Sequence, residues 1–304
     1  MSPHLDELTK CSHSCSDAPH QLASGMAEDE SRRYKTTDRR VIGFPLDPNM
    51  HGEMVKPGEL IDIREISPLT LTDRRIYNLL IANAWDRIVE PVEHVIDKSD
   101  LRGTHNGNER IEDSIRRLMS AIAEVKVMRD GKVAVKRVQL LGGNVEQEDE
   151  RGRLYYTFPK QLIEIVKESE VFGRLKTQIM YCFRSKYALA LYEIVQKRVG
   201  MRFKQAENFT VEEMRALLGV PKDKLVRFPD LNKYAIRPAL QEVNALSEHH
   251  VTIGMIKKGR RVEHLMLMWQ EKTVEEKRHV LREVERCSVG RAARIRNAVE
   301  PVAF

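Results

Sequence analysis

Twice in this chain, a helical spacing of apolar residues passes directly into an alternating spacing that is interrupted by a charged turn. In the first case NERIEDSIRRLMSAIAEVKVM changes period near Val125, and RDGK follows as a turn at 129–132. In the second case residues 231–246 have a helical pattern, and alternating segments flank KKGRR at 257–261. A period of 3.6 marks a helix and a period of two marks a half-buried strand, so each case predicts a helix followed by a β-hairpin.

Further helices are predicted ahead of both hairpins. Thr70 with Asp73, and Thr210 with Glu213, have the spacing of capping boxes at helix starts. Gly219 stops the helix FTVEEMRALLGVP, and SKYALALYEIVQKRV precedes it with one apolar face. Three helices followed by a hairpin is the order of a winged helix, a variant of the helix-turn-helix.

The expected fold is therefore α+β and helix-rich, with two tandem winged-helix domains. We expect a disordered N-terminal tail over 1–54, a first domain over 55–170, a second over 184–285 and a basic C-terminal tail over 286–304. Pro238 interrupts the last helix of the second domain, which predicts a kink or break near Arg237.

The N-terminal tail contains residue types that could suggest zinc. These are Cys11, His13, Cys15 and His20. Their spacing does not match the usual zinc patterns, and no hydrophobic core surrounds them. The polar composition favours a disordered tail, and we expect no metal and no cofactor.

Charge is distributed unevenly along the chain. Residues 184–298 contain 24 Lys and Arg against 14 Asp and Glu, whereas the rest contains 27 against 31. A basic second half joined to a mildly acidic first half favours binding of a polyanion through the second half.

The last helix of the second domain and its hairpin supply the candidate DNA-binding residues. Once the apolar face is assigned to the core, the outward helix residues are Asn232, Lys233, Tyr234, Arg237 and Gln241. The hairpin turn adds Lys257, Lys258, Arg260 and Arg261. Arg can fork onto guanine and Asn or Gln onto adenine, while hairpin cations suit phosphates. The alternative interpretation is that the outward residues of this helix form an ordinary solvated surface that binds no ligand.

Other functional classes find little support. There is no phosphate-binding Gly-x4-Gly-Lys-Ser/Thr loop, and His249 and His250 are adjacent, so a strand would point them to opposite faces. We therefore expect no enzymatic activity. No apolar run approaches the ~20 residues of a membrane span, and four scattered cysteines favour a reducing cytoplasm.

The second half resembles the RepB-type initiators of iteron-containing plasmids, through SKYALALYEIVQKR, FTVEEMRALLGV, FPDLNKYAIRPALQEVN and the basic hairpin. LTLTDRRIYNLLI in the first half also fits. The resemblance implies a bacterial cytoplasmic protein that binds repeated sites at a plasmid origin as a monomer and opens the origin with host replication proteins, such as a helicase or initiator. It also implies dimers that repress their own gene.

By the same resemblance, Lys233, Arg237 and their neighbours would read the repeat. The first domain would dimerise and add backbone contacts. A winged-helix transcriptional repressor without a role in initiation stays open as the alternative, because the family itself represses transcription.

Overall fold

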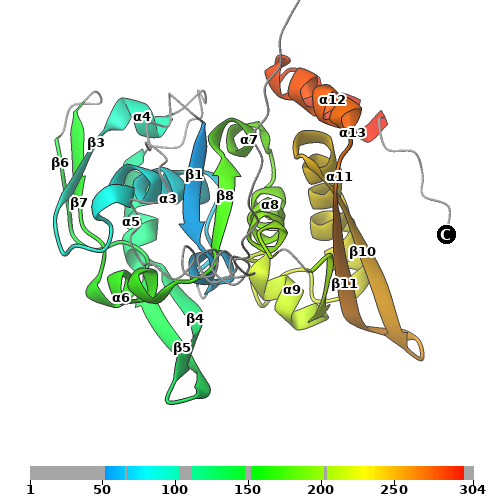
Figure 1. Cartoon of the computed structure of the whole chain (residues 1–304), viewed down its shortest axis with the longest axis horizontal. Coiled ribbons are helices and arrows are strands. Elements are labelled where there is room, and N and C mark those ends of the chain that lie inside the picture. The colour runs from blue at the N-terminus through cyan, green and yellow to red at the C-terminus, as the bar shows by residue number, and fades with distance from the viewer. Residues whose placement is uncertain (1–51, 66, 103–110, 148–151, 202–203, 298–304) are drawn as a thin grey trace, which may run out of the picture. The chain divides into compact units, whose positions relative to one another are not determined.

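The computed structural model describes residues 52–65, 67–102, 111–147, 152–201 and 204–297. The candidate zinc residues of the N-terminal tail lie outside these ranges. The described residues form one compact unit in which two winged helices follow each other along the chain (Figure 1). The predicted fold class is confirmed.

The second winged helix has the predicted elements in the predicted order. They are α8 (Lys186–Val199), β9 (Ala206–Thr210), α9 (Val211–Leu217), α10 (Phe228–Leu231), the π-helical η2 (Asn232–Ile236), α11 (Arg237–Leu246), β10 (His249–Lys258) and β11 (Arg261–Glu271). The sheet has the order β10–β11–β9, so the second hairpin strand lies in the centre. We call the continuous segment α10–η2–α11 the recognition helix.

The first winged helix is built from α2 (Gly58–Ile61), β2 (Arg64–Glu65), α3 (Leu71–Ala84), α5 (Ile111–Ser120), β4 (Ile122–Arg129) and β5 (Lys132–Gln139). Its sheet order is β2–β4–β5, with the first hairpin strand in the centre. The two domains therefore share their element order but not their strand order. Hydrophobic periodicity predicts where strands occur but not which strands pair, so the sequence could not predict this difference.

The first domain also carries a second sheet. Its strands are β3 (His94–Asp97), β7 (Arg153–Tyr156) and β6 (Asn144–Glu146), and its order is β3–β7–β6. The helical elements that complete the domain are η1 (Trp85–Arg87), α4 (Lys98–Arg102) and α6 (Lys160–Glu168). The Tyr156 hydroxyl donates to the Leu80 carbonyl at 2.7 Å, which fixes this sheet to α3.

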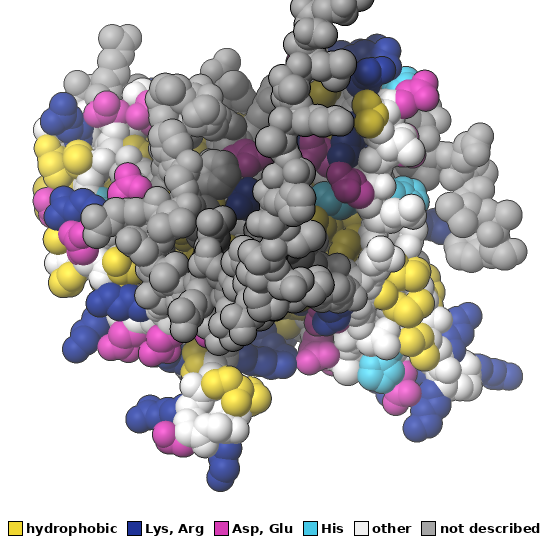
Figure 2. Space-filling model, in the orientation of Figure 1, with side chains coloured by type: hydrophobic (Ala, Val, Ile, Leu, Met, Phe, Trp, Pro, Cys, Tyr) yellow, Lys and Arg dark blue, Asp and Glu magenta, His cyan; other side chains and the backbone are white. Residues whose placement is uncertain are grey.

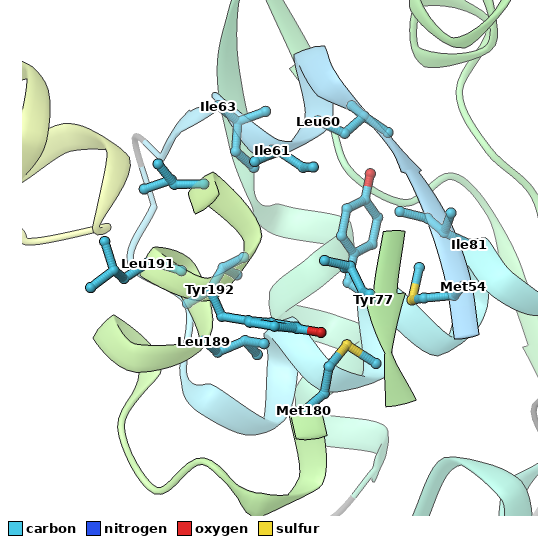
Figure 3. Close-up of a cluster of buried hydrophobic side chains, with 14 of the residues drawn as sticks. Met54, Leu60, Ile61, Ile63, Tyr77, Ile81, Met180, Leu189, Leu191 and Tyr192 are labelled. Atoms are coloured by element: carbon cyan, nitrogen blue, oxygen red, sulfur yellow. The ribbon is translucent and has the colours of Figure 1, made fainter. Parts of the chain in front are cut away.

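Strand β1 (Glu53–Pro57) pairs with β8 (Phe172–Lys176), and α7 (Thr177–Cys182) leads from β8 to α8. Figure 3 shows side chains of β1, α2, α3, α7 and α8 gathered in one hydrophobic cluster, including Tyr77, Met180 and Tyr192. Because α8 is also the first helix of the second winged helix, this cluster makes the two domains share one core.

A buried polar network crosses the same cluster. The ammonium of Lys56 on β1 lies 2.9 Å from both Glu193 Oε2 on α8 and Asn78 Oδ1 on α3. Asn78 Nδ2 donates to Glu193 Oε1 at 2.6 Å. The Lys56 and Glu193 side chains are only 4% and 2% exposed. Three elements that are distant in sequence are thus joined through one charge pair, and each charge has a partner.

The second contact to α8 is an ion-pair network at Asp62, just after α2. Arg198 donates to Asp62 at 3.0 Å and to Glu207 at 2.8 Å, and Lys197 donates to Asp62 at 2.8 Å. Burial raises the pKa of Asp62, but Arg198 and Lys197 outweigh it and hold the pKa below its usual value. The charged form therefore prevails at neutral pH.

Two helices form the C-terminal region that the structure describes. Helix α12 (Val274–Glu285) is followed by α13 (Arg291–Asn297), which lies in the basic C-terminal tail. The Arg291 guanidinium donates to the carbonyls of Glu283, Val284 and Arg286, and so satisfies the end of α12. No helix among the described residues is long and apolar enough to cross a membrane.

Candidate nucleic-acid interface

The recognition helix presents its polar face because its apolar stripe is fully buried. The stripe consists of Leu231, Ala235, Ala239, Val243 and Leu246, each 0% exposed. Lys233, Tyr234 and Arg237 are exposed, while Asn232 and Gln241 are half-buried. All five predicted helix residues therefore lie away from the core, with three of them freely accessible.

Pro238 does not break this helix. Arg237 keeps right-handed helical dihedrals, with φ −58° and ψ −51°, so of the two predicted outcomes, a kink or a break, the break is wrong. The five residues before it form a π-helical segment instead. Proline lacks an N–H and its ring crowds the carbonyl four residues earlier, and a wider turn relieves both problems. The change from α-helical to π-helical geometry therefore lies in the segment that carries Lys233 and Tyr234.

The Arg237 side chain makes no hydrogen bond or ion pair with any residue that the structure describes, and its backbone N–H donates to Asn232 O. The nearby carboxylate of Glu242 accepts the backbone N–H of Arg184 at 2.7 Å instead. Burial raises the pKa of Glu242, and the N–H groups of Arg184 and Ser185 oppose this. A surface pair with Glu242, the simplest structural use for Arg237, is therefore not formed.

Lys233 and Tyr234 interact on the same face. The Lys233 ammonium lies 5.0 Å from the centre of the Tyr234 ring, within the range of a cation–π contact. The ring is exposed, so the pair forms a small platform with one positive charge beside a flat aromatic surface. Such a surface suits both a phosphate and the face of a base or sugar.

The β10–β11 hairpin holds four cations at its tip. Lys258 is opposite Arg261, and Gly259 and Arg260 form the two-residue turn, with Gly259 at φ 62°. A positive φ at the first central position fits a type II′ turn, which glycine adopts without strain. In Figure 2, Lys and Arg side chains project at the lower right, where Figure 1 places this tip.

The cations of this hairpin have no partners among the described residues. Lys257, Lys258, Arg260 and Arg261 are all exposed, and none forms an ion pair there. Glu212 and Glu263 line one pocket with Lys258 and Arg261, but neither carboxylate forms an ion pair with these cations. Four unpaired charges on one hairpin form a surface that a phosphate backbone would neutralise.

Two residues that sequence reasoning missed hold the recognition helix at its ends. Arg215 on α9 is buried, and its guanidinium donates to Lys224 O at 2.7 Å, to Pro221 O at 3.3 Å and to Leu225 O. These carbonyls belong to the turn before the helix, where Leu225 has a positive φ of 49°. Such a conformation costs free energy in a residue with a bulky side chain, and Arg215 compensates for it.

Lys272 does the same at the other end. Its ammonium donates to the carbonyls of Ser247, at 2.8 Å, and of Asn244, which terminate α11. Burial lowers the pKa of Lys272 to about 8. Neither Arg215 nor Lys272 could be recognised in advance, because in the sequence each looks like an ordinary surface cation.

The corresponding helix of the first domain, α5, uses its charges differently. Arg117 donates to the buried Asp73 at 2.8 Å, Glu112 accepts from Lys98 at 3.2 Å, and Asp113 lies 3.9 Å from Arg116. Its mixed-sign face is therefore largely neutralised within the protein. The exposed, unpaired arginine of the recognition helix therefore has no counterpart on α5.

This tandem arrangement is also what the comparisons with known proteins find. Residues 53–196 match a family model described as "Initiator Replication protein, WH1", and residues 210–269 match one described as "Initiator Rep protein, WH2". The chain belongs to the initiator Rep protein family. Replication initiation and DNA binding through winged helices are the properties that this membership supports.

More distant similarities are found among solved structures. A crystal structure of domains 2 and 3 of RctB has 9% identity and a TM-score of 0.39, covering 72% of this chain and 86% of that chain. A second structure of RctB domains 2–3 has 12% identity and a TM-score of 0.34, covering 75% and 89%. No curated protein sequence matches this initiator Rep protein.

The exposed guanidinium of Arg237 gives a test of base reading in this initiator Rep protein. If it forks onto a guanine, Arg237→Ala should weaken binding to the preferred sequence by ~1–3 kcal/mol and affect a scrambled duplex much less. Arg237→Lys should not restore binding fully, because an ammonium lacks the planar fork. Titrations of both duplexes at one salt concentration measure this.

The matched control is Arg278→Ala, which removes an exposed arginine from α12. It should leave both titrations unchanged. Equal losses on the two duplexes would make Arg237 a phosphate contact rather than a base reader. No loss on either would remove it from the interface.

Proposed function

We propose that this chain initiates plasmid replication by binding repeated sites at the origin. The second domain reads each repeat with the recognition helix and holds its backbone with the β10–β11 hairpin. The observation that carries this proposal is the contrast between the corresponding helices of the two domains: the Arg237 side chain is unpaired among the described residues, whereas the arginines of α5 are paired. The protein acts by binding, without catalysis of its own.

The first domain then has a supporting role, as a source of backbone contacts and of self-association. The outer face of its second sheet offers a surface for a second copy. Val95, Tyr155 and Val145 lie directly opposite one another across its three strands, and both valines are exposed. Cross-strand neighbours on one face form a continuous surface, so this row can pack against the same row of another chain.

Opening of the origin, recruitment of host helicase or initiator proteins, and repression of the chain's own gene by the dimer complete the proposal. The alternative, a winged-helix repressor with no initiation role, would need only one DNA-reading unit and an effector domain. Matches to both initiator domains, in order, support the initiator.

Plasmid maintenance tests the proposal. A plasmid with no other origin, carrying the DNA beside this gene, should replicate only when the chain is supplied from a second plasmid. It should be lost when Arg237→Ala is supplied instead. A promoter fusion in the same cells measures self-repression. Repression without maintenance would support the repressor. The absence of both repression and maintenance would contradict the initiator and the repressor alike.

A further inference from the structure

One peptide group lies between two charges that come from different domains. It joins Phe183 to Arg184, in the connection between α7 and α8. The guanidinium of Arg75, on α3 of the first domain, donates to the Phe183 carbonyl. Glu242, on α11 of the second domain, accepts the Arg184 N–H at 2.7 Å. Because the C=O and N–H of a peptide group point in opposite directions, each charge faces the end of the peptide dipole that attracts it.

Arg75 fixes this connection from the first domain. Its side chain is buried, and it also donates to the carbonyls of Met180 at 3.2 Å and Tyr181 at 3.1 Å. These carbonyls belong to the last turn of α7, where no intrahelical partner is available. Burial lowers the pKa of Arg75 to about 10, so the guanidinium stays charged at neutral pH. The end of α7 is therefore anchored to α3.

Glu242 attaches the recognition helix to the same connection. The N–H groups of Arg184 and Ser185 both stabilise its carboxylate, and Ser185 is the N-cap of α8. A negative charge at the N-terminus of a helix is also favoured by the helix dipole. Figure 1 shows α8 between β8 and α11. Through Glu242, the recognition helix is thus tied to the start of a helix that both domains share.

The charge on Glu242 is not explained by stability. Burial raises the pKa of its carboxyl group, and the two N–H groups oppose this only in part. The stabilisation from a carboxyl group with a raised pKa is present at low pH and is lost as the pH rises through that pKa. At neutral pH the ionised carboxylate therefore costs folding free energy, and it forms no ion pair with a described residue. A charge kept at such a cost favours a functional role.

The position of Glu242 in the helix indicates what that role is. It directly follows Gln241 and lies five residues after Arg237, so a rotation of the helix at Glu242 moves both side chains. The other polar tether of α11 is Asn244, whose amide bonds the Val251 backbone at 2.7 Å and 2.8 Å. Asn244 ties the helix to β10 of its own domain. Of these two tethers, Glu242 is the one that leads to the first domain.

We propose that Glu242 is a positioning residue for sequence-specific DNA binding. Its hydrogen bond to the peptide group that Arg75 anchors fixes the rotation of the recognition helix, so that Arg237 meets base edges in one orientation. This rests on the proposed function, because it concerns how the second domain reads a repeat. Phosphate contacts do not require that orientation, so binding to unrelated DNA should not depend on Glu242.

Two variants that remove the same charge isolate the hydrogen bond. Glu242→Gln and Glu242→Met both remove one negative charge, but only Gln has an oxygen that can accept the Arg184 N–H. The probes are a duplex carrying one segment that the full chain protects beside its gene, and a scrambled duplex of the same length. Glu242→Met should bind the protected segment about tenfold more weakly than Glu242→Gln, the size of one hydrogen bond whose donor is left unmet. On the scrambled duplex the two variants should bind equally.

The matched controls are Glu285→Gln and Glu285→Met, at an exposed carboxylate on α12. They should bind each duplex alike. Thermal melting checks the fold, and Glu242→Gln should melt no lower than the unaltered chain. If Glu242→Met melts below the assay temperature, Arg75→Lys replaces it. Lys keeps the charge but lacks the planar fork that bonds the carbonyls, so the loss should again be confined to the protected segment.

The proposal is overturned if Glu242→Gln and Glu242→Met bind the protected segment equally, or if the Met variant loses the same affinity on both duplexes. In these cases the unaltered chain still prefers the protected segment, and the proposed function stands. If the unaltered chain binds both duplexes alike, the proposed function fails and the positioning role fails with it. The two failures are therefore distinguishable.

Discussion

Replacing Glu193 with alanine is expected to lower the free energy of unfolding by about 3–5 kcal/mol, because it leaves the Lys56 ammonium buried without a counter-charge. The two side chains are 2.9 Å apart and almost inaccessible to water. Asn78 would keep one hydrogen bond to Lys56, but an amide oxygen does not replace a full negative charge. Denaturant unfolding of the full chain measures the change.

The double variant Lys56→Met/Glu193→Leu provides the control. It removes both charges together and fills the space with apolar atoms, so it should be far less destabilising than Glu193→Ala alone. The difference between the two reports the cost of leaving Lys56 buried without its counter-charge. If both variants lose the same stability, the ion pair contributes nothing and the effect is one of packing.

The second large effect is expected from the β10–β11 hairpin. Changing Lys257, Lys258, Arg260 and Arg261 to alanine should weaken binding to every duplex alike and leave the preferred sequence unchanged. Each lost phosphate contact should reduce the slope of log K against log salt by ~0.9, or up to about 3.6 for all four. Titrations over a salt series measure the slope.

A control with the same change in charge is available in the C-terminal helices. Arg278, Arg282, Arg286 and Arg296 are exposed there, and their replacement by alanine should leave the salt slope unaltered. An unchanged slope in the hairpin variant would show that the hairpin does not touch phosphate. A loss confined to the preferred sequence would instead make it a base-reading element.

Features that depend on neighbouring residues were predictable from the sequence. The capping boxes at Thr70 and Thr210 are both confirmed, with each threonine accepting the N–H three residues later. The buried stripe of the recognition helix and the tight RDGK turn are confirmed as well. Helix periodicity, caps and two-residue turns are short-range properties, so a single sequence contains them.

Features that depend on tertiary contacts were not predictable. Lys56 and Glu193 are 137 positions apart, and no local pattern joins them. The π-helical segment before Pro238 and the central place of β4 in its sheet depend on packing against other elements. Arg215 had no distinguishing signal, since its three carbonyl partners come from an irregular turn.

The DNA contacts themselves remain predictions, although the structure leaves seven of the nine candidate residues exposed and Asn232 and Gln241 half-buried. Their exposure and lack of partners among the described residues could not be read from composition. From the sequence, Arg237 could equally have formed a surface ion pair with Glu242. In the structure the Glu242 carboxylate accepts the backbone N–H of Arg184 and forms no ion pair with Arg237.

In the proposed function, this chain binds an ordered series of sites through its second domain. Footprinting of the full chain on the DNA beside its gene tests this directly. We expect several protected segments in the same orientation, repeated at about 20 base pairs, two helical turns, so that each copy meets the same face of the duplex. A single isolated site, or uniform protection without a repeat, would contradict it.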